Sequence, residues 1–212
     1  MSNMTLVNRA DDATAVRVAI YKRPIMQTAL GTIAWRVISL PAGASWQLWV
    51  ESAYEIEARI HGQFPEVAND EETGPVAVPF DGAGMDCVIE GGPALHILPR
   101  AISAGAVNYG EVRVENRTRH EVWVKVLKDS LPLYWSFVVM PGQTRAEDLR
   151  QPFYLAVVPN DVGPGDRLDD VALLSTQTPV VEGGVVVIRG SAGRHVAELF
   201  RDPAAGQRLR SC

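Results

Sequence analysis

Val16-Arg17-Val18-Ala19-Ile20-Tyr21-Lys22 is the stretch that decides the fold. Its valines and isoleucine recur at every second position, which is the period of a β-strand with one face turned toward a core. The same pattern returns as Val122-Trp123-Val124-Lys125-Val126-Leu127-Lys128, and an Asn-Arg pair precedes each copy. A strand that is written twice in this way predicts an internal duplication.

Three further blocks repeat in the same order along the chain. The block Ile33–Pro41 matches Leu133–Pro141 at an offset of 100, and the block Val88–His96 matches Val187–His195 at an offset of 99. The residue pairs aligned in this way are Trp35 with Trp135, Tyr54 with Tyr154, and His96 with His195. We therefore predict a first module at residues 1–102, a linker at 103–107, a second module at 108–202 and a flexible C-terminal tail at 203–212.

Turn-forming residues define the fold class. The 212 residues include 18 glycines and 14 prolines, and they recur between short apolar runs at intervals of about 8 to 12 residues. This spacing predicts seven or eight strands in each module, and the best helical candidate, residues 145–150, is too short for more than one turn. The predicted fold is all-β, with two tandem, internally duplicated antiparallel β-sandwich domains of immunoglobulin-like or jelly-roll topology.

Charge and hydropathy exclude several partners. The formal net charge is -5, so the chain lacks the basic excess that binds a phosphate backbone, and we expect no nucleic-acid partner. No apolar run approaches the ~18 residues of a membrane span, and no signal peptide is visible. The expected location is cytoplasmic by default, with non-classical export left open. Of the two cysteines, we expect Cys87 to be a buried apolar residue and Cys212 to be able to cross-link two chains.

Aromatic residues and histidines are interpreted according to whether they repeat. The repeated Trp35 and Trp135 are predicted core anchors, and the repeated His96 and His195 are predicted to bond to backbone at the start of a strand. Trp46, Trp49 and Trp123 have no matching tryptophan. Since Trp46 and Trp49 are three residues apart, a regular strand turns them to opposite faces. An exposed member of this set, Trp46, Trp49 or Trp123, would provide an aromatic platform for a sugar or a partner protein; the plainer interpretation is that they pack at the rim against the neighbouring module.

Two acidic loops are the candidate metal sites. They contain Asp70, Glu71 and Glu72 in the first half, and Asp161, Asp166, Asp169 and Asp170 in the second. Clustered carboxylates in a glycine-containing loop suit calcium, whereas solvated charge is the plainer interpretation. Calcium is the one cofactor that the sequence suggests.

Three functions remain open at this stage. Motifs of hydrolases, nucleotide-binding proteins and zinc sites are not found, so we expect no catalytic residue. The first hypothesis is a non-catalytic structural protein that associates with itself or with another protein through strand edges. The second is a carbohydrate-binding module that uses the unmatched tryptophans, with or without calcium. The third is an enzyme with a dispersed site, with Asp81 and Asp86 or the loop carboxylates as acid and base.

Overall fold

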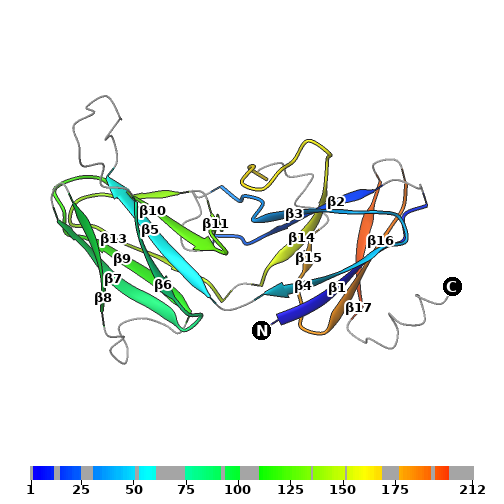
Figure 1. The fold of residues 1–212 in the computed structure, drawn as a ribbon, viewed down its shortest axis with the longest axis horizontal. Helices are drawn as coiled ribbons and strands as arrows, with labels where there is room; N and C mark the ends of the chain where they lie inside the picture. Colours follow the sequence, from blue (N-terminus) through cyan, green and yellow to red (C-terminus); the bar gives the residue numbers. More distant parts are fainter. Residues whose placement is uncertain are drawn as a thin grey trace. The chain divides into compact units, whose positions relative to one another are not determined.

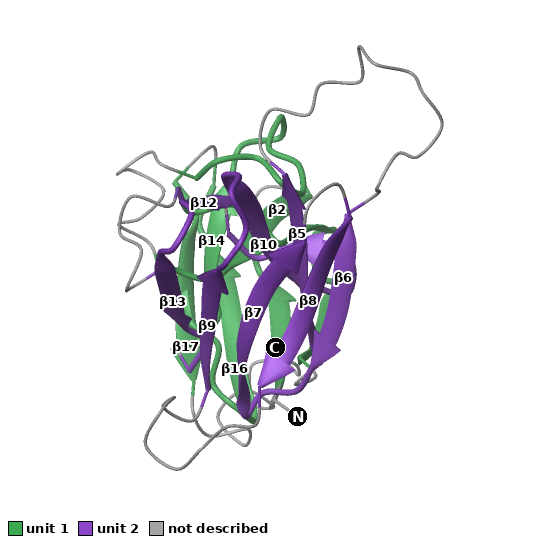
Figure 2. Cartoon of the chain, turned by 90° about the vertical axis from the view of Figure 1, so that its left-hand side faces the viewer, with its two compact units in different colours: residues 1–23, 32–52, 152–212 green, residues 24–31, 53–151 purple. Residues whose placement is uncertain are grey.

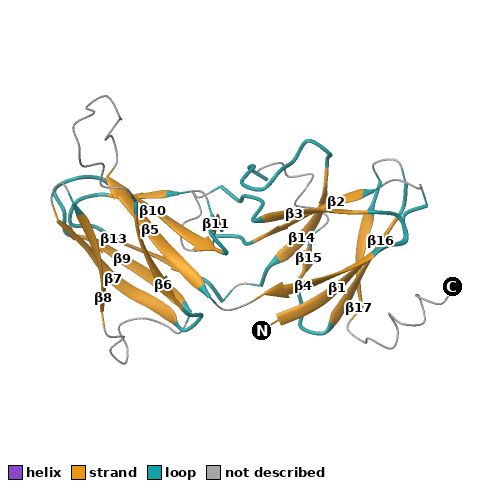
Figure 3. Ribbon diagram, in the orientation of Figure 1, coloured by secondary structure: helices purple, strands orange, loops and turns teal. Residues whose placement is uncertain are grey.

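The structure, a computed structural model, consists of strands and loops in the part of the chain that it describes (Figure 1, Figure 3). The described residues are 2–11, 15–24, 31–50, 53–60, 75–91, 94–100, 110–134, 136–150, 152–168, 177–191 and 194–200. These ranges contain seventeen strands and no helix, so the all-β prediction is confirmed. A helix of the length and apolarity that a membrane span requires is accordingly not found in them. The helical candidate at residues 145–150 is wrong, because Thr144–Asp148 pairs with a neighbouring strand.

The strands form two compact units, shown in green and purple in Figure 2. Unit 1 comprises residues 1–23, 32–52 and 152–212. It has two four-stranded sheets, with strand orders β17-β16-β1-β4 and β15-β14-β2-β3. The strands of unit 1 are β1 (Ser2–Asn8), β2 (Val16–Tyr21), β3 (Arg36–Leu40), β4 (Ser45–Val50), β14 (Tyr154–Val158), β15 (Thr178–Pro179), β16 (Gly184–Arg189) and β17 (Val196–Phe200).

Unit 2 comprises residues 24–31 and 53–151. Its sheets have the orders β13-β9-β7-β8 and β11-β10-β5-β6, and β12 also pairs with β10. The strands of unit 2 are β5 (Tyr54–Ile60), β6 (Val76–Phe80), β7 (Gly84–Gly91), β8 (Leu95–Arg100), β9 (Glu111–Asn116), β10 (Val122–Lys128), β11 (Leu131–Pro132), β12 (Phe137–Val139) and β13 (Thr144–Asp148).

Each unit takes strands from both halves of the sequence, which differs from the predicted tandem modules. Unit 1 combines β1–β4 with β14–β17, and unit 2 combines β5–β8 with β9–β13. The halves are joined at β1–β16 and β7–β9, which are parallel, and at β2–β14 and β5–β10, which are antiparallel. The sandwiches are therefore mixed rather than purely antiparallel, and the predicted linker at 103–107 and tail at 203–212 lie outside the described residues.

A short connection gives one physical reason for this arrangement. β4 ends at Val50 and β5 begins at Tyr54. To close the first half on itself, β5 would have to take the place of β14, beside β2 in the second sheet of unit 1. The path from β4 to that position spans the ~10 Å between the two sheets and, at a right angle to it, two inter-strand spacings of ~5 Å. The direct distance is therefore about 14 Å. Four Cα–Cα steps reach about 14 Å only when fully extended, so β5 joins the other unit instead.

The two units share one strand order. If β9, β10, β12 and β13 are matched to β1, β2, β3 and β4, and β14–β17 to β5–β8, each sheet of unit 1 has a counterpart in unit 2 with the same neighbours. The parallel pair occupies the same place in both units. Both units thus have the strand order that two copies of one module would produce if they exchanged their second halves.

The repeated asparagines hold equivalent turns in the two units. Asn8 and Asn116 are both fully buried. The Asn8 side chain donates to the carbonyl of Leu40 at 2.8 Å, and that of Asn116 donates to the carbonyl of Val139 at 2.7 Å. The Asn116 amide also donates to the carbonyl of His120 at 2.8 Å. The repeated Asn-Arg pair is therefore a structural motif at the end of β1 and β9.

Strand registers shift some of the residue pairs inferred from sequence by one position. Val16 pairs with Leu40, and its counterpart Val122 pairs with Val139, so the offset here is 99 rather than 100. By this register the fully buried Trp35 corresponds to Tyr134, and Trp135 lies outside the described residues.

The other two residue pairs inferred from sequence, Tyr54 with Tyr154 and His96 with His195, are also shifted by one position. Tyr21 pairs with Tyr154 and its counterpart Leu127 pairs with Glu55, so Tyr154 matches Glu55 and the residue before it, Phe153, matches Tyr54. His96 pairs with Glu90, whereas Val196 pairs with Arg189, so His96 matches Val196 rather than His195. A one-residue slip turns a side chain to the opposite face of the sheet, and His96 is accordingly exposed on β8.

A positive backbone φ fixes the same turn in both units. Gly91 and Gly190, at the ends of β7 and β16, have φ values of 121° and 100°. A Cβ atom there would lie 2.1 Å from the carbonyl oxygen of Ala94 and 2.3 Å from that of Arg194, respectively. Only glycine fits these turns, which aim β8 and β17 back along their partner strands.

Candidate functional site

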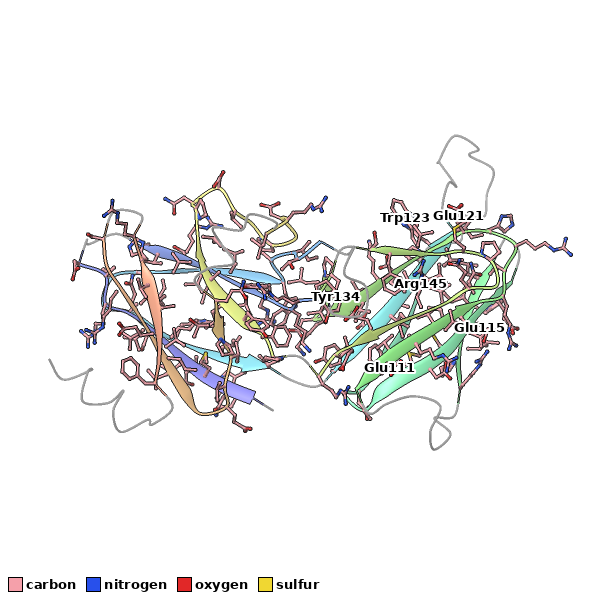
Figure 4. All side chains as sticks on the ribbon, turned by 180° about the vertical axis from the view of Figure 1, so that it is seen from behind. Glu111, Glu115, Glu121, Trp123, Tyr134 and Arg145 are labelled. Atoms are coloured by element: carbon pink, nitrogen blue, oxygen red, sulfur yellow. The ribbon has the colours of Figure 1, made fainter. Side chains whose placement is uncertain are left out.

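The unmatched tryptophans lie on different surfaces. On β4, Leu48 is fully buried and Trp49 is 54% exposed, so Trp49 points away from the core. Trp46, on the inward face, is half-buried. Trp123 lies in unit 2 on β10, where the Arg59 guanidinium is 4.6 Å from the centre of its ring (Figure 4). Trp49 and Trp46 face opposite ways and therefore do not share one platform, and Arg59 covers a face of Trp123.

Strand β4 is a sheet edge that lacks the residues that usually prevent pairing with another chain. It is the last strand of its sheet, and its sequence Ser-Trp-Gln-Leu-Trp-Val contains neither a charge nor a proline. Among the described edge strands of four or more residues, each of the others contains at least one charged residue or proline: β3, β6, β8, β13 and β17. Natural edge strands use such residues to prevent pairing with another chain. The β4 edge is therefore the candidate interaction surface of unit 1.

Unit 2 contains a buried polar cluster formed by Tyr54, Lys128, Tyr134 and Glu147. The Lys128 ammonium donates to the carbonyl of Ala53 at 3.2 Å and lies 4.9 Å from the centre of the Tyr54 ring. Lys128 and Glu147 are fully buried, and Tyr134 is 1% exposed. Burial, and next the negative charge of Glu147, hold the pKa of Tyr134 well above its ordinary value of 10. Burial also raises the pKa of Tyr54.

The corresponding place in unit 1 is largely apolar. Lys22 matches Lys128, is also buried, and lies 4.9 Å from the ring of Phe153, the counterpart of Tyr54. Trp35 replaces Tyr134 and packs against Phe153 at 4.9 Å. Leu48 takes the position of Glu147, because both pair with matching residues of β1 and β9. The lysine therefore belongs to the shared fold, whereas the hydroxyls and the carboxylate are particular to unit 2.

A pocket of about 300 Å³ opens beside this cluster in unit 2. It is lined by Ala53, Tyr54, Glu55, Pro79, Phe80 and Asp129. The rings of Tyr54 and Phe80 stack with centres 5.5 Å apart. Asp129 reaches the pocket because it and Ser130 adopt positive φ values of 50° and 60° in the two-residue turn between β10 and β11. The pocket thus combines an aromatic pair with two carboxylates, one from β5 and one from the turn after β10, a combination that suits a cationic group.

The structure describes only part of the two acidic loops. Asp70, Glu71, Glu72, Asp169 and Asp170 lie outside the described residues. Asp161 and Asp166 are exposed in unit 1, where the Asp166 carboxylate accepts the Gly163 N–H at 2.7 Å and its backbone carbonyl accepts the Ala34 N–H at 2.9 Å. Within the described ranges, no three His, Cys, Asp or Glu side chains come together in a way that could hold a metal ion. The Asp166 carboxylate therefore stabilises a turn within its own loop, and its backbone carbonyl holds that loop against the segment before β3.

The two carboxylates considered for catalysis differ in their surroundings. Asp81 is exposed, and its side chain accepts the Ala83 N–H at 2.9 Å in a turn before β7. Asp86 is 5% exposed on β7, where it lies opposite Arg100 on one side and Arg113 on the other. Asp86 therefore takes part in a charged row across the outer face of the sheet.

No family model, no curated protein and no solved structure matches this chain.

Proposed function

We propose that the protein is a non-catalytic structural protein that assembles with itself, and that two copies pair along β4. In this proposal the chain is a duplicated module whose copies have exchanged halves, and the β4 edge is the surface left for a further copy. The observation that carries the proposal is the uncharged, proline-free edge of β4 with Trp49 54% exposed beside it.

The contrast with the counterpart strand supports this choice. β13 reads Thr-Arg-Ala-Glu-Asp and occupies the same edge position in unit 2. Charges on an edge disfavour pairing, so β13 is protected where β4 is open. An antiparallel β4–β4 pair would extend the sheet across a two-fold axis, as homodimers commonly do.

Trp49 supplies an apolar contribution to such a pair. A tryptophan buries up to about 250 Å², so covering its exposed half removes ~100 Å² from water. At ~25 cal/mol per Å², this stabilises the pair by about 2–3 kcal/mol for each copy. Strand pairing alone adds backbone hydrogen bonds along β4.

The test is the oligomeric state by sedimentation velocity over a range of concentrations. We expect the wild type to associate, and Gln47→Lys, which places like charges across the pair, to weaken association by about tenfold or more. Gln47 is exposed, so the fold should survive. The matched control is Thr144→Lys at an exposed position on β13, which should leave association unchanged. A wild type that stays a single chain at high concentration, or equal effects of both variants, would refute the proposal.

Carbohydrate binding is a second candidate, and the exposure of Trp49 is what favours it. An exposed indole ring can stack on a sugar. Intrinsic tryptophan fluorescence with a panel of glycans, with and without a chelator, distinguishes the two functions. A saturable change that Trp49→Ala abolishes, in a protein that does not self-associate, would assign Trp49 to sugar binding instead.

A further inference from the structure

We propose that the unit 2 pocket binds a guanidinium group, such as the side chain of an arginine in another polypeptide. The proposal does not depend on assembly through β4, because the pocket lies in the other unit and is formed by β5, β6 and the turn after β10.

The strongest support comes from comparing the two units at matching positions. Lys22 corresponds to Lys128, so the next residue, Arg23, corresponds to Asp129. Tyr154 corresponds to Glu55 by strand register. In unit 1 the Arg23 guanidinium lies 5.6 Å from the centre of the Tyr154 ring. Unit 1 thus places its own guanidinium over an aromatic ring at this end of the sheet.

Unit 2 has a carboxylate at each of these positions. Glu55 and Asp129 line the pocket instead of a tyrosine and an arginine. A cation placed in the pocket is attracted by both carboxylates. The Tyr54 ring is already covered by Phe80 and by the Lys128 ammonium, so the partly exposed Phe80 ring supplies the aromatic surface for a planar guanidinium.

On the buried side of the pocket, the Lys128 ammonium already has partners within the protein. Lys128 is fully buried, donates to the carbonyl of Ala53 and lies against the Tyr54 ring. A volume of about 300 Å³ is enough for the end of an arginine side chain together with its methylene groups.

The experiment measures amide chemical shifts of ¹⁵N-labelled protein with Nα-acetyl-arginine methylamide as the probe. The matched ligand control is Nα-acetyl-citrulline methylamide, which has the same shape without the charge. We expect saturable shifts at Tyr54, Glu55, Phe80 and Asp129 with the arginine probe, and at least about fivefold weaker binding of the citrulline probe. Equal binding of both probes, or shifts elsewhere alone, would overturn the proposal.

Variants of the pocket make the assignment specific. Asp129→Asn keeps the turn, because asparagine tolerates a positive φ, and we expect it to weaken arginine binding about threefold to fivefold. Glu55→Gln should act in the same direction, whereas Asp161→Asn, at an exposed carboxylate of unit 1, should have no effect. The same affinity in all three variants would contradict the proposal. Free arginine and spermidine, tested alongside, show whether the pocket prefers a residue within a chain or a small molecule.

Discussion

If the chain is cut between its two halves, we expect the two fragments to stay associated as one folded protein. A site for a specific protease is placed within residues 103–107, and the purified protein is cleaved under native conditions. Because unit 1 and unit 2 each contain strands from both halves, the two fragments are expected to remain together. Two tandem modules would instead separate after cleavage.

The size of the effect follows from the ladders that join the halves. Five residue pairs join β1 to β16, six join β7 to β9, five join β2 to β14 and six join β5 to β10. A ladder forms about one backbone hydrogen bond per residue pair, and each contributes ~1 kcal/mol net, so the four ladders stabilise the joined halves by about 20 kcal/mol. This exceeds the ~5–15 kcal/mol by which a whole domain is usually stable, so neither half should keep its fold without a partner.

The assay is size-exclusion chromatography with light scattering, followed by denaturing electrophoresis. We expect the cleaved protein to elute at the position of the intact chain and to give two bands only after denaturation. Each half made alone should lack the near-ultraviolet circular dichroism of the whole protein, and mixing the halves should restore it. Two separate monomeric peaks, each unfolding cooperatively, would refute the interleaved arrangement.

Three further predictions concern the shared framework and the buried groups. Asn116→Ala and Asn8→Ala should each destabilise the protein by about 2–4 kcal/mol in urea unfolding, because each removes a fully buried amide that donates to backbone carbonyls of the turn. Tyr134→Phe should leave stability unchanged or raise it by up to ~1 kcal/mol, since the Tyr134 hydroxyl is buried without a hydrogen-bond partner in the structure as described; a loss above 2 kcal/mol would contradict this. Burial raises the pKa of Cys87 from an ordinary 9 to about 12, so between these values the folded state binds more protons and its stability falls as pH rises, by up to about 4 kcal/mol. Urea unfolding at pH 8 and pH 10.5 should show a smaller loss in Cys87→Ala than in the wild type.

The alternating pattern was sufficient to predict the strands. Val122, Val124 and Val126 are at most 1% exposed in β10 and alternate with partly exposed residues, as a period of two requires. In β2 the intervening Ala19 and Tyr21 are buried as well, so that strand is covered on both faces. Similarity of sequence does not show which copy supplies the neighbouring strand, because matching strands present similar residues to either partner. One local feature of the sequence does indicate that the strands are exchanged between units, namely the three-residue connection between Val50 and Tyr54.

Alignment by residue identity also could not fix the register. Trp35 and Trp135 match as letters, yet the pairing of β2 with β3 and of β10 with β12 matches Trp35 to Tyr134. Such a slip is invisible in a sequence without knowledge of hydrogen bonds across the sheet.

The pocket was likewise beyond prediction from motifs. Its residues come from β5, β6 and a turn, and no spacing along the chain brings Glu55 and Asp129 together. A signal did exist, since Arg23 in one copy stands where Asp129 stands in the other. This reversal of charge between matching positions is the sequence feature that supports the guanidinium proposal.

The outer faces of the sheets give a second reason why the halves pair as they do. In unit 1, Val7 of β1 lies opposite Val187 of β16, and both are buried in an apolar cluster with Val185. In unit 2, the matching face is ionic: Arg113 of β9 lies opposite Asp86 of β7, and Glu115 forms an ion pair with Arg100.

Closing each half on itself would exchange these partners. β1 would then meet β7 and place Thr5 opposite Asp86, while β9 would meet β16 and place Arg113 opposite Val185, by the same registers. The exchange would place Arg113 opposite an apolar residue and would separate Glu115 from Arg100, whereas Asp86 would keep Arg100 on its other side. A charge on a partly buried face that loses its opposite charge costs more than the mere loss of an attractive contact. The differences between the two units therefore favour the interleaved pairing over the closed one. They also leave one sheet with an uncharged edge at β4 and another with a charged edge at β13.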